Sequence, residues 1–98
     1  MEADEIKAVY ATVEGRVQGV GFRFFVQNVA DRLHLTGWVR NKGDDRVEVY
    51  AEGQAEKLNE LLDTLRRGPS SAMVTNVILQ WTSPGFKYAR FSILPSEY

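Results

Sequence analysis

The sequence predicts an α+β fold in which two helices cover one face of an antiparallel sheet. Short stretches in which apolar and polar residues alternate predict strands, and two stretches with apolar residues three and four positions apart predict helices. These segments follow one another in the order βαββαβ, which is typical of the ferredoxin-like sandwich. A chain of 98 residues has the size of one domain, so we expect a single domain over residues 1–98.

Period-2 alternation predicts the strands. The stretch "VYATVE" places valine and alanine at every second position, as a half-buried strand requires. In "RVEVYAEG" the valines and alanine form one face, and Glu48, Tyr50 and Glu52 form the other. The predicted strands are residues 7–14, 37–41, 46–53 and 74–81. The segment "ARFSIL", residues 89–94, is expected to form either a short fifth strand or an edge return.

Two apolar stripes with helical spacing predict the helices. The first begins at Phe22 directly after a glycine-rich stretch and ends before "TG" at residues 36–37. The second is stopped by "GPSS" at residues 68–71. The first stripe consists of Phe22, Val26, Val29, Ala30 and Leu33, and the second of Leu58, Leu61, Leu62 and Leu65.

Composition excludes several classes of function. The net charge of −1 argues against broad nucleic-acid contact, and the absence of cysteine excludes disulfides, thiolate catalysis and cysteine zinc sites. The one histidine, His34, cannot make a multi-histidine metal site. No apolar run approaches the roughly 20 residues that span a bilayer, and the acidic start "MEADEIK" lacks the apolar stretch of a signal peptide. We therefore expect a cytoplasmic protein, with a monomer as the simplest assembly.

The predicted topology brings two distant segments together. In this fold the first two strands run parallel with the third between them, so their C-terminal ends lie at one edge of the sheet. Two strand spacings separate them by about 9.5 Å, which fits a small anion and a water molecule. Arg23, after the first strand, and Asn41, at the end of the second, can therefore belong to one site.

The stretch "GRVQGVGFR", residues 15–23, has the features of an anion site. Gly15, Gly19 and Gly21 allow backbone angles that turn successive N–H groups inward, and the following helix adds the positive end of its dipole. Arg23 in the first helical turn can grip a phosphoryl group through two hydrogen bonds. The alternative is an ordinary glycine-rich connection followed by a surface arginine. The spacing matches neither a P-loop nor a dinucleotide fingerprint.

Other polar residues are interpreted without a catalytic role. Asp44 and Asp45 in "KGDDR" are expected to be turn residues with solvated charges, and His34 is expected to face solvent or the carbonyls at the end of the first helix. An RNA-binding domain of this fold would show the aromatic RNP1 pattern on a central strand, whereas "RVEVYAEG" contains only Tyr50 and is acidic.

The motifs "GRVQGVGFR" and "TGWVRNKGDDRVEVYAEG", with the later "RGPSSAMVTNV" and "FSI", resemble the acylphosphatase family over nearly the whole chain. The resemblance implies a ferredoxin-like fold and hydrolysis of the carboxyl–phosphate bond of acyl phosphates, without a metal, a cofactor or a covalent intermediate. It assigns substrate binding to Arg23 and orientation of the attacking water to Asn41. Inorganic phosphate is the expected product and competitive inhibitor. The phosphate loop implied by the resemblance, which binds mainly through backbone N–H groups, is Gly15, Arg16, Val17, Gln18, Gly19, Val20, Gly21 and Phe22.

The sequence departs from the family pattern at two places. Asp45 stands where the family usually has glycine, which predicts a local adjustment of the turn, and the tail "LPSEY" extends past the usual Arg-Tyr end. An alternative is an acylphosphatase-like domain of a larger maturation enzyme that handles carbamoyl phosphate. The length of 98 residues without zinc-binding cysteines favours a free-standing enzyme. The physiological acyl phosphate stays open.

Overall fold

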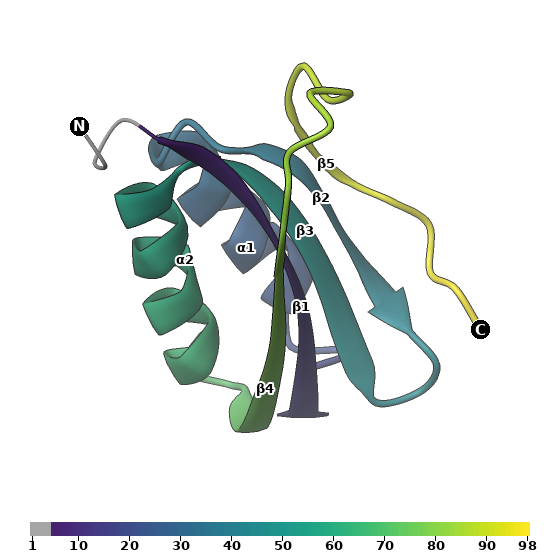
Figure 1. Cartoon of the computed structure of the whole chain (residues 1–98). Helices are drawn as coiled ribbons and strands as arrows, with labels where there is room; N and C mark the ends of the chain where they lie inside the picture. Colours follow the sequence, from purple (N-terminus) through teal and green to yellow (C-terminus); the bar gives the residue numbers. More distant parts are fainter. Residues whose placement is uncertain (1–4) are drawn as a thin grey trace.

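A single five-stranded sheet with two helices on one face organises the molecule, as the computed structural model of the chain shows (Figure 1). The structure describes residues 5–98, so most of the acidic N-terminal stretch lies outside the described residues. The strand order is β4-β1-β3-β2-β5. The elements are β1 (Ile6–Arg16), α1 (Phe22–Arg32), β2 (Thr36–Lys42), β3 (Arg46–Gln54), α2 (Ala55–Arg67), β4 (Met73–Thr82) and β5 (Phe91–Ile93).

The predicted element order and layering are confirmed. Neighbours among the first four strands pair antiparallel, and β3 lies between β1 and β2 as expected. The third strand begins at Arg46 as predicted, and the other predicted strand ends differ from the observed ones by one or two residues. The segment after β4 does form a fifth strand, and it pairs parallel to β2. The sheet is therefore antiparallel as predicted, except at this edge strand.

The core lies between the helices and the sheet. Both predicted helical stripes face it, and Leu58, Leu61 and Leu65 of α2 are fully buried. Valines on alternate positions of β1 and β3 meet them from the sheet, which confirms the period-2 pattern. Burying such an aliphatic side chain contributes roughly 1.5–3 kcal/mol. Neither helix, at 11 and 13 residues, is long and apolar enough to cross a membrane.

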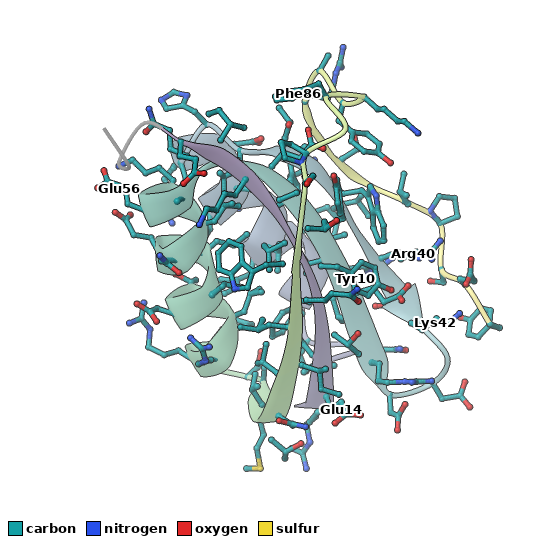
Figure 2. All side chains as sticks on the ribbon, viewed as in Figure 1. Tyr10, Glu14, Arg40, Lys42, Glu56 and Phe86 are labelled. Atoms are coloured by element: carbon teal, nitrogen blue, oxygen red, sulfur yellow. The ribbon has the colours of Figure 1, made fainter. Side chains whose placement is uncertain are left out.

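The sheet face opposite the helices is more enclosed than the alternating pattern predicts. Glu48 and Glu52, expected on an outward polar face, are only 6% and 3% exposed. The reason is tertiary. The chain from β4 to β5 crosses this face, and the N–H groups of Gly85 and Phe86 donate to Oε2 of Glu52, as does the Tyr50 hydroxyl. Figure 2 shows Phe86 on this crossing segment and Tyr10 and Arg40 on the face itself.

His34 follows the C-cap of the first helix and has a left-handed backbone (φ 58°). Its N–H donates to the carbonyl of Asp31, and the N–H of Leu35 donates to that of Ala30, so the two bonds satisfy two of the last four carbonyls of α1. His34 is exposed, as predicted, and its backbone rather than its imidazole does the capping.

Candidate active site

The C-terminal ends of β1 and β2 lie at the same level of the sheet. Glu14 of β1 and Lys42 of β2 both pair with Arg46 of β3. The segment that follows β1 and the residue before Lys42 are therefore separated by one intervening strand. The topology that the sequence predicts thus brings the glycine-rich stretch and Asn41 to one end of the sheet.

The glycine-rich stretch divides into a strand end and a loop. Gly15 and Arg16 still belong to β1, where they pair with Val74 and Met73 after a bulge. A Cβ at Gly15 would lie 2.1 Å from the carbonyl oxygen of Met73, and its φ of +127° favours glycine. Gly15 is therefore required for the contact of β1 with β4. The connection to α1 is shorter than the sequence suggests and spans residues 17–21.

Gly19 and Gly21 keep the loop open. Their φ angles are +72° and +76°, and a Cβ at either position would meet no atom of the described part of the chain within 4 Å. Gly21 is the N-cap of α1, which has no side-chain cap and no acidic residue in its first turn. The N–H groups at this helix end therefore have no side-chain acceptor within residues 5–98, and they carry the positive end of the helix dipole. This backbone is suited to an anion.

The side chains of Val17 and Phe22 serve the core rather than the surface. They are 1% and 2% exposed. Burial of these two side chains fixes both ends of the loop, and only their backbone groups can face a ligand. Val20 is partly buried, and its carbonyl accepts a hydrogen bond from the hydroxyl of Ser71.

Arg23 lies in the first turn of α1 and is half-buried. Within residues 5–98 it forms no ion pair. A guanidinium at the positive end of a helix, without a carboxylate partner in that range, is available to an anionic group.

Asn41 lies on the helix-facing side of β2, on the same face of the strand as the buried Val39. Its residue exposure is 9%, and its Oδ1 atom is buried without a hydrogen-bond partner among the described residues. Burying an acceptor without a donor costs about 1–3 kcal/mol. Among residues 5–98 this is the only buried side-chain N or O atom in that condition.

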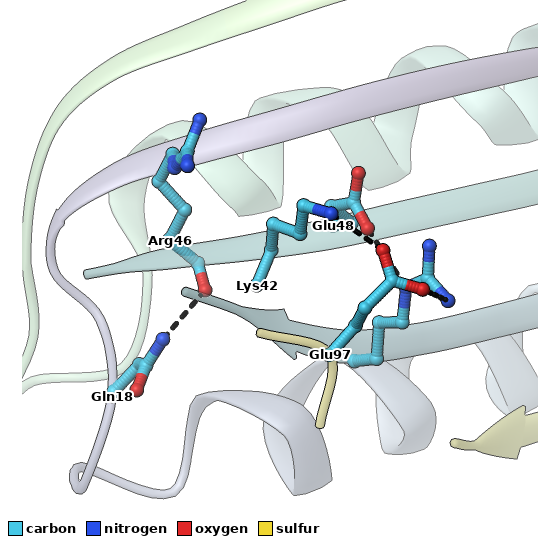
Figure 3. Close-up of polar contacts among 6 residues, drawn as sticks. Gln18, Lys42, Arg46, Glu48 and Glu97 are labelled. Atoms are coloured by element: carbon cyan, nitrogen blue, oxygen red, sulfur yellow. Dashed lines mark hydrogen bonds and ion pairs between the residues drawn. The ribbon is translucent and has the colours of Figure 1, made fainter. Parts of the chain in front are cut away.

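Gln18 joins the loop to the turn after Asn41. Its side-chain amide donates to the carbonyl oxygens of Gly43 at 3.1 Å and Arg46 at 2.9 Å, the second of which is drawn in Figure 3. The sequence predicted a backbone role for Gln18, and nothing in the local pattern indicates this side-chain contact. The two partners lie 25 and 28 residues away.

The turn between β2 and β3 accommodates Asp45 without the left-handed backbone that glycine would favour. Gly43 takes the left-handed position instead, with a φ of 61°, while Asp44 and Asp45 are exposed. This agrees with the prediction of solvated turn residues. Asp45 Oδ1 lies 3.7 Å from Nε of Arg46.

A charged network lies on the other face of β2, beside the site. Arg40 pairs with Glu48 at 2.8 Å and with Glu97 at 3.0 Å, and Lys42 also contacts Glu97 (Figure 3). The hydrogen bond from Lys42, followed by the charge of Arg40, holds the pKa of the Glu97 carboxyl below its usual range. Burial, followed by the charge of Glu97, raises the pKa of Glu48. The sequence analysis did not predict this network.

No group of three or more metal-binding side chains is found within the part of the chain that the structure describes. The site residues predicted at this end of the sheet offer the backbone N–H groups of the loop, the Arg23 guanidinium and the Asn41 carboxamide.

The sequence and the fold are similar to those of known proteins. The sequence profile of the acylphosphatase family matches residues 9–93. An acylphosphatase of Bacillus licheniformis is 47% identical over 81 residues, which cover 83% of this chain and 90% of the relative. The crystal structure of acylphosphatase from Bacillus subtilis superposes with a TM-score of 0.86 at 39% identity, over 92% of this chain and 99% of that chain. Full-length HypF, in a phosphate- and nucleotide-bound form, matches with a TM-score of 0.86 at 27% identity, over 96% of this chain and 12% of that chain.

Proposed function

Because the chain belongs to the acylphosphatase family and hydrolyses acyl phosphates, we propose that residues 15–23 and Asn41 carry out that reaction. Water attacks the phosphorus atom, a bond from the water oxygen to phosphorus forms, and the bond from phosphorus to the acyl oxygen breaks. The products are a carboxylate and inorganic phosphate. The leaving group is stable as an anion, so the reaction needs little acid catalysis and depends on positioning and charge stabilisation.

The loop and Arg23 are the phosphoryl cradle. The N–H groups of the loop at Gly19 and Gly21 and of the first turn of α1 donate to phosphoryl oxygens. The guanidinium of Arg23 binds two of these oxygens and stabilises the charge that develops in the transition state. The support for this is the left-handed glycines and the lack of a side-chain cap on α1. The support also includes the absence of an ion pair to Arg23 within residues 5–98.

Asn41 orients the attacking water, and its buried Oδ1 is the observation that carries this proposal. An acceptor left without a donor in the fold is suited to a water molecule that donates to it while facing the phosphorus. A carboxamide is too weakly basic to remove the proton. The proton of the water passes to a phosphoryl oxygen of the substrate. The phosphoryl group, now bonded to the water oxygen, is released as inorganic phosphate.

The substrate is a small acyl phosphate, and inorganic phosphate competes with it for the cradle. The enzyme acts without a metal ion, as a monomer in the cytoplasm. Carbamoyl phosphate and benzoyl phosphate offer the same phosphoryl group with different acyl parts. The ratio of kcat/KM for these two substrates measures how strongly the site discriminates between acyl groups.

Hydrolysis of benzoyl phosphate in the presence of EDTA, followed by ultraviolet absorbance, tests the proposal. We expect metal-free turnover that inorganic phosphate inhibits competitively. Arg23→Ala should lose turnover and phosphate affinity together, with a rate loss of at least roughly 10²–10³-fold. Asn41→Ala should lose turnover by a similar factor and retain phosphate affinity.

Arg32→Ala is the matched control, because Arg32 is an exposed arginine in the last turn of the same helix. It should retain full activity. If Asn41→Ala lost phosphate affinity as completely as Arg23→Ala, the division between cradle and water orientation would be wrong.

A further inference from the structure

The chain after β5 lies along the free side of β2 and continues the parallel pairing. The N–H of Leu94 donates to the carbonyl of Val39 at 2.9 Å, and the N–H of Glu97 donates to that of Asn41 at 2.9 Å. The N–H of Gly43 then donates to the carbonyl of Glu97 at 2.7 Å. The backbone of Asn41 is therefore held by β3 on one side and by Glu97 on the other.

The side chain of Glu97 reinforces this contact from the opposite face of β2. Its Oε2 atom lies 3.0 Å from Nη1 of Arg40, and its Oε1 atom contacts Nζ of Lys42. Arg40 and Lys42 are the residues directly before and after Asn41. Figure 3 shows the Lys42 side chain pointing toward the Glu97 carboxylate. One residue thus contacts the backbone of Asn41 and the side chains of both its neighbours.

Arg40 also connects Glu97 to a buried residue of the central strand β3. Nε of Arg40 bonds to Glu48 of β3 at 2.8 Å, and the side chain of Glu48 is only 8% exposed. Arg40 also stacks against Trp38, with the guanidinium carbon 4.8 Å from the ring centroid. Arg40 is therefore well ordered, and a carboxylate bound to it is held in a defined place.

We propose that Glu97 is a positioning residue for the hydrolysis, holding the end of β2 so that the Asn41 carboxamide faces the attacking water. The inference rests on the proposed role of Asn41. Strand ends open more easily than strand centres, and Asn41 is the next-to-last residue of β2. A misplacement of about 1 Å can cost about 10²-fold in rate, so a clamp at this point matters for turnover.

The expected effect falls on rate more than on stability. The side chain of Glu97 is 46% exposed, and ion pairs at such positions contribute little to the free energy of unfolding. Glu97→Gln removes the charge and keeps the size and backbone of the residue. We expect kcat for benzoyl phosphate to fall roughly tenfold, with the inhibition constant of inorganic phosphate and the Tm near those of the wild type.

Tyr98→Ala is the matched control, because Tyr98 is the next residue and is 85% exposed. It should leave kcat unchanged. Equal kcat values for Glu97→Gln, Tyr98→Ala and the wild type would overturn the proposal. A parallel loss of phosphate affinity and Tm in Glu97→Gln would also overturn it, since that result indicates a general structural role.

A double-mutant cycle tests whether Glu97 acts through Asn41. In the Asn41→Ala background, Glu97→Gln should have no further effect on the residual kcat. Full additivity of the two losses would contradict the proposal. The charged groups that face Glu97 are Arg40, Lys42 and, beyond Arg40, Glu48. Because the pKa of Glu97 is held below its usual range, the difference in kcat between the wild type and Glu97→Gln should narrow only in acid.

Amide hydrogen exchange separates this proposal from the proposed function. If the wild type failed to hydrolyse benzoyl phosphate, or Arg23→Ala remained active, the proposed function would be wrong. The exchange rates of the backbone amides of Gly43 and residue 97 would still test whether the Glu97 side chain holds the end of β2 in place. Faster exchange at both in Glu97→Gln supports it, and unchanged exchange overturns it.

Discussion

The side-chain amide of Gln18 donates a hydrogen bond of 2.9 Å to the carbonyl oxygen of Arg46. A second bond from the same nitrogen reaches Gly43 at 3.1 Å. One side chain thus attaches the loop between β1 and α1 to the turn that follows Asn41. The proposed phosphoryl cradle and the turn next to Asn41 are therefore linked by hydrogen bonds within the protein itself.

Removing this link should loosen the site. Gln18→Ala leaves two carbonyl oxygens of the turn without their donor, and we expect the free energy of unfolding to fall by about 1 kcal/mol because water can replace part of the lost bonding. Both kcat and phosphate affinity should fall, since the loop and the turn lose their fixed relation. Urea denaturation and benzoyl phosphate kinetics measure the two effects.

Asn28→Ala is a suitable control for Gln18→Ala, because Asn28 is an exposed amide on α1. A Gln18→Ala enzyme with wild-type kcat and phosphate affinity would show that the link has no part in catalysis.

The glycines of the stretch 15–23 should differ in what they contribute to stability. Gly15→Ala would place a methyl group 2.1 Å from the Met73 carbonyl oxygen, and backbone cannot move aside as a side chain can. We expect a loss of roughly 3 kcal/mol or more in the free energy of unfolding. Gly19→Ala meets no atom within 4 Å and should cost only the left-handed backbone, about 1–2 kcal/mol. Equal stabilities of the two variants, measured by thermal unfolding, would contradict this division.

The Asn41 side chain should lower the stability of the fold while serving the reaction. Its Oδ1 atom is buried without a partner among residues 5–98, and such an atom lowers the stability of the fold. Asn41→Ala should therefore lose turnover while its free energy of unfolding stays at the wild-type level or rises by about 1 kcal/mol. Chemical denaturation in phosphate-free buffer measures this. A clear destabilisation would mean that the carboxamide has a structural partner.

The Tyr50 phenol should ionise at an unusually high pH. Burial, followed by its hydrogen bond to Glu52, raises the pKa of Tyr50 to about 12. The unfolded phenol ionises near pH 10, so the stability contributed by this group is fully present below that pH and is lost as the pH rises toward 12. Absorbance of the phenolate in wild type and Tyr50→Phe isolates its titration. Glu52→Gln should bring the pKa down, and an unchanged midpoint would show that Glu52 is not a cause of the shift.

The sequence was most informative where a requirement is local. Strands and helices repeat with periods of about 2 and 3.6 residues, so the alternating valines of β1 and the leucine stripe of α2 could be predicted from the sequence alone. The place of Arg23 and Asn41 at one end of the sheet also followed, because the βαββαβ order leaves few ways to arrange the strands. Asp45 and His34 lie in exposed turn positions as predicted.

Contacts between distant segments could not be predicted in this way. The polar face of β3 seemed solvent-exposed in the alternating pattern, yet Glu52 is buried by a segment that begins 31 residues later and donates to it at Gly85, 33 residues away. The side-chain role of Gln18 and the contact of Glu97 with Asn41 depend in the same way on which segments pack together.

The sequence by itself therefore determined the elements and the layering, which follow from residue type and spacing along the chain. It also predicted a site made of a glycine-rich loop, one arginine and one asparagine, and the roles of the last two came from the resemblance to the family. The tertiary structure decided which glycine is needed for packing and which for the open loop. It also decided that Asn41 is buried with an unpartnered oxygen, and that the tail of the chain lies against it. These features arise where strands and loops far apart in sequence meet, and a pattern confined to neighbouring residues carries no information about such contacts.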